Sequence, residues 1–302
     1  MLTRSAARLA SLPGAVLTML LAALALSLSG CSHGDSGTHA AASSSRARAS
    51  SQARMADPSP SPSPSPSPST TEAPAVPPSP PDGACYRLTF SELASSAVSD
   101  HPYLCRKTHT TQTIYVGRLH TDAGVDSAEA RAQMARVCPR QLARYLGGSR
   151  SSRHLSRFNV VWFVPSPEQA AAGARWFRCD AIAFGRPDHL FPLPRPARLH
   201  GILDRSGALD TYGLCGTTAP GSSRFARVAC GLPHRWRAVS TIHLAGDSYP
   251  GRHAVRTAGN SICRDRVRAT RGFSLRFSYG WEWPTRQQWT NGQHYGFCWA
   301  PD

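Results

Sequence analysis

The hydrophobic and polar positions beyond residue 83 predict the same order of elements twice. Residues 112–119 and 238–244 are expected to form strands, each starting just after a Cys-x3-His motif. A stripe with the period of a helix follows each strand, over residues 127–146 and 253–269. The expected inner face of the first helix consists of Ala128, Arg131, Ala132, Ala135, Cys138, Leu142 and Tyr145. That of the second helix consists of Ala254, Ala258, Ile262 and Cys263.

Local signals set the ends of these elements. Gly147 and Gly148 follow the first helix and are expected to end it, and Pro139 inside it is expected to kink or split it. Residues 166–169 and 285–288 have the pattern of a helix N-terminus with a capping box. Gly173 and Gly292 would end these short helices, and the closing strands are expected at residues 174–181 and 293–299. Strands before and after a main helix favour an α+β fold with an antiparallel sheet.

The first part of the chain has no such periodicity. From residue 32 to residue 81 apolar side chains are almost absent, and proline and serine alternate from Pro58 to Ser69. Proline-rich chain favours extended polyproline II and cannot bury a core. We therefore expect residues 31–82 to form a disordered stalk.

A short apolar run from Leu12 to Leu28 precedes the stalk, behind Arg4 and Arg8. It ends in Leu-Ser-Gly-Cys, which resembles a bacterial lipobox. The resemblance implies that residues 1–30 are a signal peptide, and that Cys31 becomes the N-terminus and carries acyl chains such as palmitate. Several acyl chains hold a protein on a membrane far better than one does.

The eight remaining cysteines form an internal repeat. The two sets are Cys85, Cys105, Cys138, Cys179 and Cys215, Cys230, Cys263, Cys298. Five identical residues also recur 119 positions later in the chain. They are Trp162, Pro165, Gln169, Gly173, Cys179 and, in the second half, Trp281, Pro284, Gln288, Gly292, Cys298. We expect two tandem small disulfide-bearing domains at residues 83–185 and 211–302. A proline-containing connector at residues 186–210 would join them.

An exported chain with four cysteines in each domain favours two disulfides per domain. Sequence alone leaves three connectivities open in each domain, and we favour first-to-second and third-to-fourth. The alternative is a metal site, because His109 and His234 each follow a cysteine by four positions. No Cys-x2-Cys partner accompanies them, so we expect no metal and no cofactor. We expect both histidines to be structural, each bonding a loop carbonyl through one ring nitrogen.

The net charge of +16 predicts attraction to polyanions. Outside the cytoplasm these are anionic lipid head groups or phosphate-rich wall polymers, and the compartment disfavours nucleic acid. Catalytic signatures such as Gly-x-Ser-x-Gly and His-Glu-x-x-His are absent from the sequence. We therefore expect that the protein is not an enzyme. An aromatic cluster is expected to be core rather than a ligand groove: Trp281, Trp283, Trp289, Tyr295, Phe297 and Trp299.

The repeated motifs resemble the septum formation domain of actinobacterial membrane proteins and lipoproteins. The second half carries Val228-Ala229-Cys230-Gly231-Leu232-Pro233-His234, Tyr249-Pro250-Gly251, Cys263, and Pro284-Thr285-x2-Gln288-Trp289-x2-Gly292-x5-Cys298. The first half carries Cys105-x3-His109, Cys138, Pro165-x3-Gln169-x3-Gly173 and Cys179. Together they cover residues 83–182 and 212–300. Family members usually carry an acidic residue three positions after the histidine, where this chain has Gln112 and Arg237, so no local His–carboxylate pair is expected.

These observations predict a non-enzymatic surface lipoprotein on the outer face of the cytoplasmic membrane. Its partner would be a wall polymer, the membrane surface, or a division or envelope protein. The alternative is an extracytoplasmic hydrolase or metal-dependent sensor that uses His109 or His234. The sequence does not identify the partner, the oligomeric state or the arrangement of the two domains.

Overall fold

The computed structural model describes residues 75–95, 97, 101–195 and 198–302. The predicted signal peptide, the lipidation site Cys31 and most of the stalk lie outside these residues. The described residues all belong to one compact unit. Among the helices of the described part, none has the length and apolar character needed to cross a membrane.

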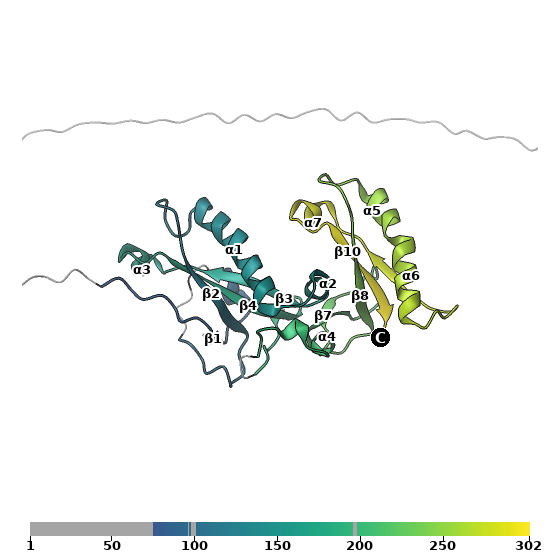
Figure 1. Ribbon diagram of the computed structural model, residues 1–302, viewed down its shortest axis with the longest axis horizontal. Coiled ribbons are helices and arrows are strands. Elements are labelled where there is room, and N and C mark those ends of the chain that lie inside the picture. Colours follow the sequence, from purple (N-terminus) through teal and green to yellow (C-terminus); the bar gives the residue numbers. More distant parts are fainter. Residues whose placement is uncertain (1–74, 96, 98–100, 196–197) are drawn as a thin grey trace, which may run out of the picture. The chain divides into compact units, whose positions relative to one another are not determined.

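The first antiparallel sheet has the strand order β1-β2-β4-β3, with β5 paired to the end of β4. Its strands are β1 (Cys85–Tyr86), β2 (Thr111–Arg118), β3 (Phe158–Phe163), β4 (Trp176–Arg186) and β5 (His189–Leu190). Its helices are η1 (Ser91–Ala94), α1 (Ala128–Leu146), α2 (Arg150–His154) and α3 (Pro167–Ala171). Helix α1 packs across β2, β3 and β4, and β1 pairs with β2 at the edge of the sheet (Figure 1).

The second antiparallel sheet has the order β7-β6-β8-β10-β9. Its strands are β6 (Leu214–Gly216), β7 (Arg227–Ala229), β8 (Trp236–His243), β9 (Gly280–Glu282) and β10 (Tyr295–Pro301). Its helices are α5 (Arg252–Ala258), α6 (Asn260–Thr270) and α7 (Arg286–Thr290). Helix α6 packs on β8, β9 and β10.

The two sheets share strand order and register at matched positions. The order β6-β8-β10-β9 repeats the order β1-β2-β4-β3. Cys85 pairs with Gln112, and Cys215 pairs with Arg237 at the corresponding place. In the closing strands, the fourth cysteine of each set faces the tryptophan of the preceding strand, Trp162 or Trp281. The prediction of a mixed fold with antiparallel sheets is confirmed.

The capping signals are confirmed. The hydroxyl of Ser127 accepts the amide of Ala130 at 3.1 Å at the start of α1. Reciprocal capping boxes begin α3 and α7, as the sequence predicts. Gly173 follows α3 with a φ of 94°, a conformation that side chains with a Cβ rarely adopt.

The predicted inner face of the first helix is wrong in part. Cys138 is buried, but Ala128, Arg131, Ala132 and Ala135 are exposed. The buried residues of α1 are instead Ala130, Met134, Cys138 and Leu146. The prediction followed the alanines, whereas the larger apolar side chains, which gain most from burial, determine the buried face. Helix α1 also continues through Pro139 without a break.

The second predicted helix is wrong as one element, because it breaks at Gly259 into α5 and α6. Val255, Cys263 and Val267 are buried, and the predicted Ala254, Ala258 and Ile262 are exposed. The ring of Trp281 occupies the space that a Cβ at residue 259 would need. Its indole Nε1 donates to the carbonyl of Val255 at 3.2 Å. The tryptophan therefore packs where the helix breaks.

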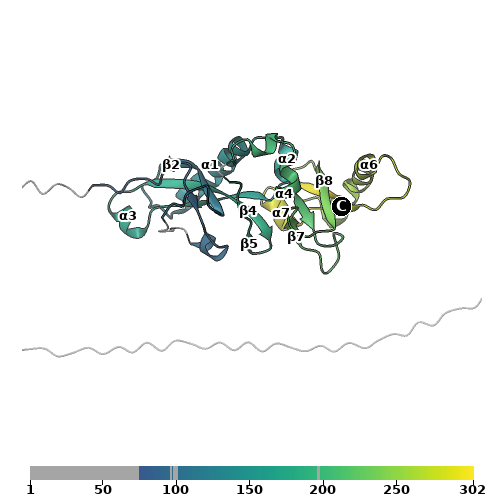
Figure 2. The ribbon, with the colours of Figure 1, turned by 90° about the horizontal axis from the view of Figure 1, so that it is seen from below.

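The predicted connector is part of the first core. It contains η2 (Ile202–Asp204) and the start of α4 (Ala208–Tyr212), which come between β5 and β6 along the chain. Helix α4 is labelled in Figure 2. Four of its residues are buried among the residues of the first sheet and α1: Leu193, Leu199, Ile202 and Leu203. Conversely, Leu155 of the first half of the chain lies among buried residues of the second sheet. Its carbonyl accepts a hydrogen bond from the amide of Leu214 at 2.7 Å.

Candidate functional site

Three disulfides join the described cysteines. Cys85 pairs with Cys105, Cys138 with Cys179, and Cys215 with Cys230, at Cα–Cα distances of 5.3, 5.4 and 5.0 Å. This is the connectivity that the sequence favours, first to second and third to fourth. The Cys138–Cys179 bridge fastens α1 to β4, so the main helix is tied to the closing strand.

Cys263 and Cys298 occupy the places that correspond to Cys138 and Cys179, and both are buried thiols in the structure. The Sγ of Cys263 donates to the carbonyl of Gly280 at 3.2 Å. A hydrogen bond with Cys263, together with burial, raises the pKa of the Cys298 thiol. The two thiols therefore contact each other, and a fourth bridge between them stays a prediction.

His109 lies at the end of the loop before β2 and is fully buried. Its Nδ1 donates to the carbonyl of Lys107 at 2.9 Å, which is the structural role that the sequence predicts. The amide of Leu193, in the connector, donates to the carbonyl of His109 at 3.0 Å. The Nε2 of His109 finds no hydrogen-bond partner among the described residues. The connector thus covers the first histidine.

His234 makes the same loop contact, because its Nδ1 donates to the carbonyl of Leu232 at 2.7 Å. Its Nε2 lies 2.5 Å from Oδ2 of Asp302. The second histidine therefore contacts a loop carbonyl through one ring nitrogen and the carboxylate of Asp302 through the other.

Arg237 completes this cluster. Its Nε and Nη2 lie 3.2 Å from the two carboxylate oxygens of Asp302, and its Nη1 lies 3.2 Å from Oδ1 of Asp210. Hydrogen bonding from Arg237 and then from His234 holds the pKa of Asp302 below its usual range. Arg237 stands where the resembling family usually has an acid, and it binds a distant acid instead.

The sequence predicted no local His–carboxylate pair, and His234 instead pairs with a carboxylate from far along the chain. The carboxylate comes from Asp302, 68 positions along the chain. The local sequence around the histidine carries no signal for this pairing, because only the sheet topology brings the end of β10 beside the start of β8.

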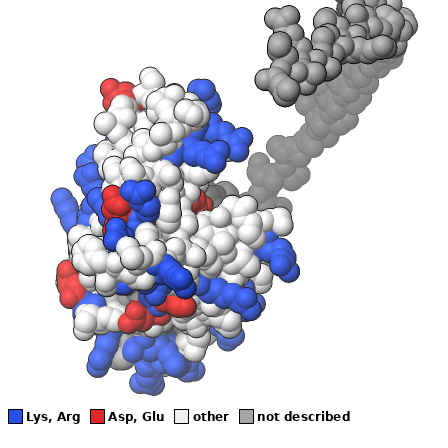
Figure 3. Space-filling view, turned by 90° about the vertical axis from the view of Figure 1, so that its right-hand side faces the viewer, with Lys and Arg blue, Asp and Glu red and all other residues white. Residues whose placement is uncertain are grey.

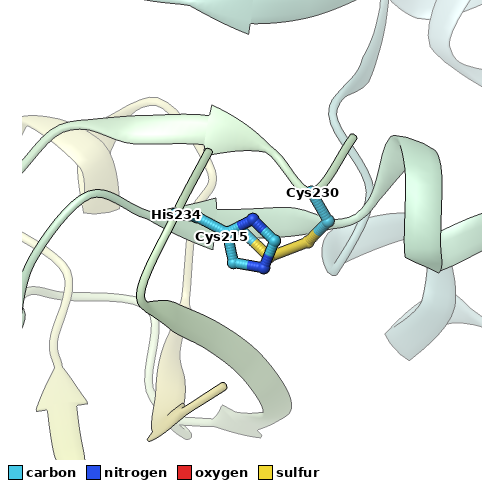
Figure 4. Close-up of side chains that lie close together, drawn as sticks. All are labelled: Cys215, Cys230 and His234. Atoms are coloured by element: carbon cyan, nitrogen blue, oxygen red, sulfur yellow. A yellow bond between two sulfur atoms is a disulfide. The ribbon is translucent and has the colours of Figure 1, made fainter. Parts of the chain in front are cut away.

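Cys215, Cys230 and His234 are close enough to suggest a metal site, since their ligand atoms lie within 4.8 Å of one another (Figure 4). Zinc binds cysteine as the thiolate. The two sulfurs are bonded to each other, so neither offers a thiolate. These residues cannot ligate a metal ion while the bridge is intact. The contact of His234 with Asp302 instead fixes the end of β10 to the loop before β8.

Comparison with known proteins gives one similarity. The family model described as Septum formation matches residues 150–298. Neither the curated proteins nor the solved structures contain a significant match. The matched segment begins in α2, takes in β3, α3 and β4, and continues through most of the second sheet. Over these residues the chain is similar to the Septum formation family, which suggests a role related to septum formation.

Proposed function

We propose that this chain is a lipid-anchored, non-enzymatic protein of the cell envelope that acts in septum formation. In this proposal two tandem domains, one around each sheet, stand on the outer face of the cytoplasmic membrane, joined to Cys31 by the stalk. The family match and the repeated strand order support it. The second domain would bind an anionic envelope surface, either lipid head groups or a phosphate-rich wall polymer.

The observation that carries the binding proposal is an arginine-rich surface on α5, α6 and the loop after α6. We call these residues the arginine surface: Arg252, Arg256, Arg264, Arg266, Arg268, Arg271 and Arg276. Asp265 is the one acidic residue between Arg252 and Arg276. On the side of the molecule where α6 lies in Figure 1, cationic side chains outnumber acidic ones (Figure 3). Such a surface attracts phosphate-bearing partners.

Two apolar side chains project from the same loop. Phe273 is 68% exposed and Leu275 is 87% exposed, and Arg271 and Arg276 flank them. Exposed apolar residues next to cations suit an interface with anionic lipid, where the cations meet head groups and the apolar groups enter the acyl boundary. A wall polymer would use the cations alone.

The experiment is a binding titration of the full chain, solubilised in detergent, on supported bilayers and on purified wall polymer. One variant replaces four exposed arginines of this surface, Arg252, Arg264, Arg271 and Arg276, with glutamine. The matched control makes the same change at four exposed arginines of α1: Arg131, Arg136, Arg140 and Arg144. We expect the first variant to lose binding and the control to keep most of it, with the wild-type affinity falling as salt rises. Equal losses in both variants, or binding that ignores salt, would contradict a role for the arginine surface.

A second pair of variants separates the two anionic partners. Replacing Phe273 and Leu275 with serine removes the apolar groups and leaves the charge unchanged. Binding to bilayers should fall if lipid is the partner, and binding to wall polymer should be unchanged.

The anchor is tested separately. Cys31→Ser should release the protein from the membrane fraction, and mass spectrometry of the wild-type N-terminal peptide should show the acyl chains. Retention of the serine variant on the membrane would contradict lipid anchoring.

A metal-dependent hydrolase or sensor is the second candidate. The short distances between Cys215, Cys230 and His234 favour it. It requires stoichiometric zinc in the protein as isolated, together with free thiols at both cysteines. Metal analysis and thiol titration of the same sample test it, and we expect neither zinc nor free thiols at these positions.

A further inference from the structure

The first sheet carries a polar stripe on the face opposite α1. Trp176, Arg178 and Asp180 alternate along β4, so their side chains share one face, whereas Cys179 points the other way and is bridged to Cys138 of α1. The hydroxyl of Thr113, on β2, donates to Oδ1 of Asp180 at 2.8 Å. Polar residues at the centre of a buried face are unusual, and they need an explanation.

Arg178 is the central residue of this stripe and is only 2% exposed. Its guanidinium lies between two aromatic rings, 3.9 Å from the ring centroid of Tyr86 and 4.7 Å from that of Phe163. Stacking of this kind fixes the plane of the guanidinium and leaves its edges available for hydrogen bonds.

The donors on these edges are not satisfied. Nε of Arg178 lies 3.4 Å from Oδ2 of Asp180, near enough for an ion pair, yet no hydrogen bond forms. Nη2 of Arg178 and Nε1 of Trp176 likewise have no acceptor among the described residues. A buried donor without an acceptor costs free energy, so native proteins rarely keep several in one place.

These two residues line the same pocket, of about 720 Å³, which has the size of a small-molecule site. Its other walls mix apolar residues, such as Tyr86, Pro81 and Pro102, with polar ones, such as His101 and Gln169. The pocket is therefore a hollow of mixed polarity, lined by an arginine and an indole that carry donors without acceptors among the described residues.

The second sheet has no counterpart of this site. At a shift of 119, Tyr295, Phe297 and Trp299 replace Trp176, Arg178 and Asp180. The indole Nε1 of Trp299 is satisfied, because it donates to Oε2 of Glu282 at 3.0 Å. The unsatisfied donors thus belong to the first sheet specifically, and the repeated fold does not require them.

We propose that this pocket binds the carboxylate of a small organic acid or peptide end, with Arg178 and Trp176 as the donors. A guanidinium fork matches the two oxygens of a carboxylate, and the apolar residues of the walls suit an organic body attached to it. Asp180 beside the arginine and Glu168 on the rim disfavour a ligand with two negative charges. The ligand is therefore a monoanion. This site does not depend on the arginine surface of the second sheet.

The test is calorimetry on the full chain in detergent, with N-acetyl-phenylalanine as the probe and its amide as the uncharged analogue. The acid should bind at least tenfold more tightly than the amide. Arg178→Lys keeps the charge but loses the fork, and should weaken binding about tenfold. Trp176→Phe removes one donor and should weaken binding about threefold to fivefold. Controls are Trp162→Phe on β3 and Arg136→Lys on α1, neither of which lines the pocket, and both should bind as the wild type does.

Equal affinity for the acid and the amide, or equal affinity of Trp176→Phe and Trp162→Phe, would overturn the proposal. Tighter binding of inorganic phosphate than of the acid would overturn the assignment to a carboxylate. Arg178→Lys changes a buried group, so its unfolding temperature is measured alongside. If it fails to fold, the Trp176→Phe and Trp162→Phe pair still decides the outcome. Binding of the arginine surface to anionic envelope material is measured with other variants, so the two proposals fail independently.

Discussion

The two sheets show how one strand order accommodates two different interiors. On the first, Arg178 and Asp180 are both buried, and the guanidinium of Arg178 stacks on the rings of Tyr86 and Phe163. On the second, Phe297 and Trp299 take the same places and build an aromatic core. Cysteines, capping boxes and register are shared, whereas the face away from the main helix is not. The positions that determine the fold are therefore separable from those that give each sheet its chemistry.

The histidines differ in the same way. Each bonds a loop carbonyl two positions before it, so their local structural role is common to both sheets. His109 is then covered by the connector, while His234 is paired with Asp302 at the surface. The two histidines therefore share one kind of contact but differ in their second partner.

The largest expected effect concerns the bridge between main helix and closing strand. Replacing both Cys138 and Cys179 with alanine should lower the free energy of unfolding by about 4 kcal/mol, because the bridge closes a loop of 41 residues. We expect Cys263 and Cys298 to be bridged in the exported protein, and their double alanine variant to lose a similar amount. Denaturant unfolding of both variants measures the two losses.

Non-reducing peptide mapping checks the bridge directly. Four bridges are expected, each within one set of four cysteines. Two unmodified thiols at residues 263 and 298, together with a loss of only about 1 kcal/mol in their variant, would instead show that the sheets differ in this covalent link as well.

The second prediction concerns Asp180, the carboxylate that is buried in the first sheet. Burial raises the pKa of Asp180 from 3.8 to about 6, against the opposing effect of Arg178. The folded state therefore holds this proton more tightly than the unfolded state, so the stabilisation is complete below pH 4 and is lost as the pH rises through 6. The loss amounts to about 3 kcal/mol for a shift of this size.

Asp180→Asn removes this titration. We expect the difference in unfolding free energy between wild type and variant to change between pH 4 and pH 6.5 and to be flat above. Tyr86 and Arg178 also face this carboxylate, and both keep one charge state across that range. Parallel stability curves for the two proteins would show that Asp180 is already ionised at pH 4.

The sequence predicted the elements that depend on local chemistry. The capping boxes of α3 and α7 could be identified because caps act within a few residues. The repeat grouped the cysteines into two sets of four, but the sequence only favoured one of three connectivities in each set. Three of the four expected bridges are present in the structure.

What the sequence missed depends on contacts between distant residues. The break at Gly259 exists because Trp281 packs there, and glycine alone does not predict a break. Asp302 reaches His234 only through the pairing of β10 with β8. The pocket at Arg178 is likewise formed by five separate segments, so no single motif marks it.

The third prediction concerns Gly259, where the second main helix breaks although the first main helix does not. Gly259→Ala should destabilise the protein by about 1 to 3 kcal/mol, because the added Cβ would meet the ring of Trp281. Gly259 has a φ of −100°, so no backbone strain contributes. Without the clash, alanine would stabilise a helical position by about 0.5 to 1 kcal/mol. Chemical denaturation of a double-mutant cycle with Trp281→Phe measures the coupling, and additive effects would mean that the ring does not cause the break.

The smallest effect is expected at the pair that distinguishes the second histidine. Asp302→Asn should cost between 0 and about 1 kcal/mol, since the carboxylate is more than one-third exposed and solvent screens it. The pKa of Asp302 is lowered in the folded state, chiefly by Arg237, so its contribution is present above the unfolded pKa and is lost as the pH falls through the folded value. The measurement is the unfolding free energy of wild type and variant at low and high salt. The gap should close at high salt, and a gap that persists would mean that His234 and Asp302 are held by packing rather than by charge.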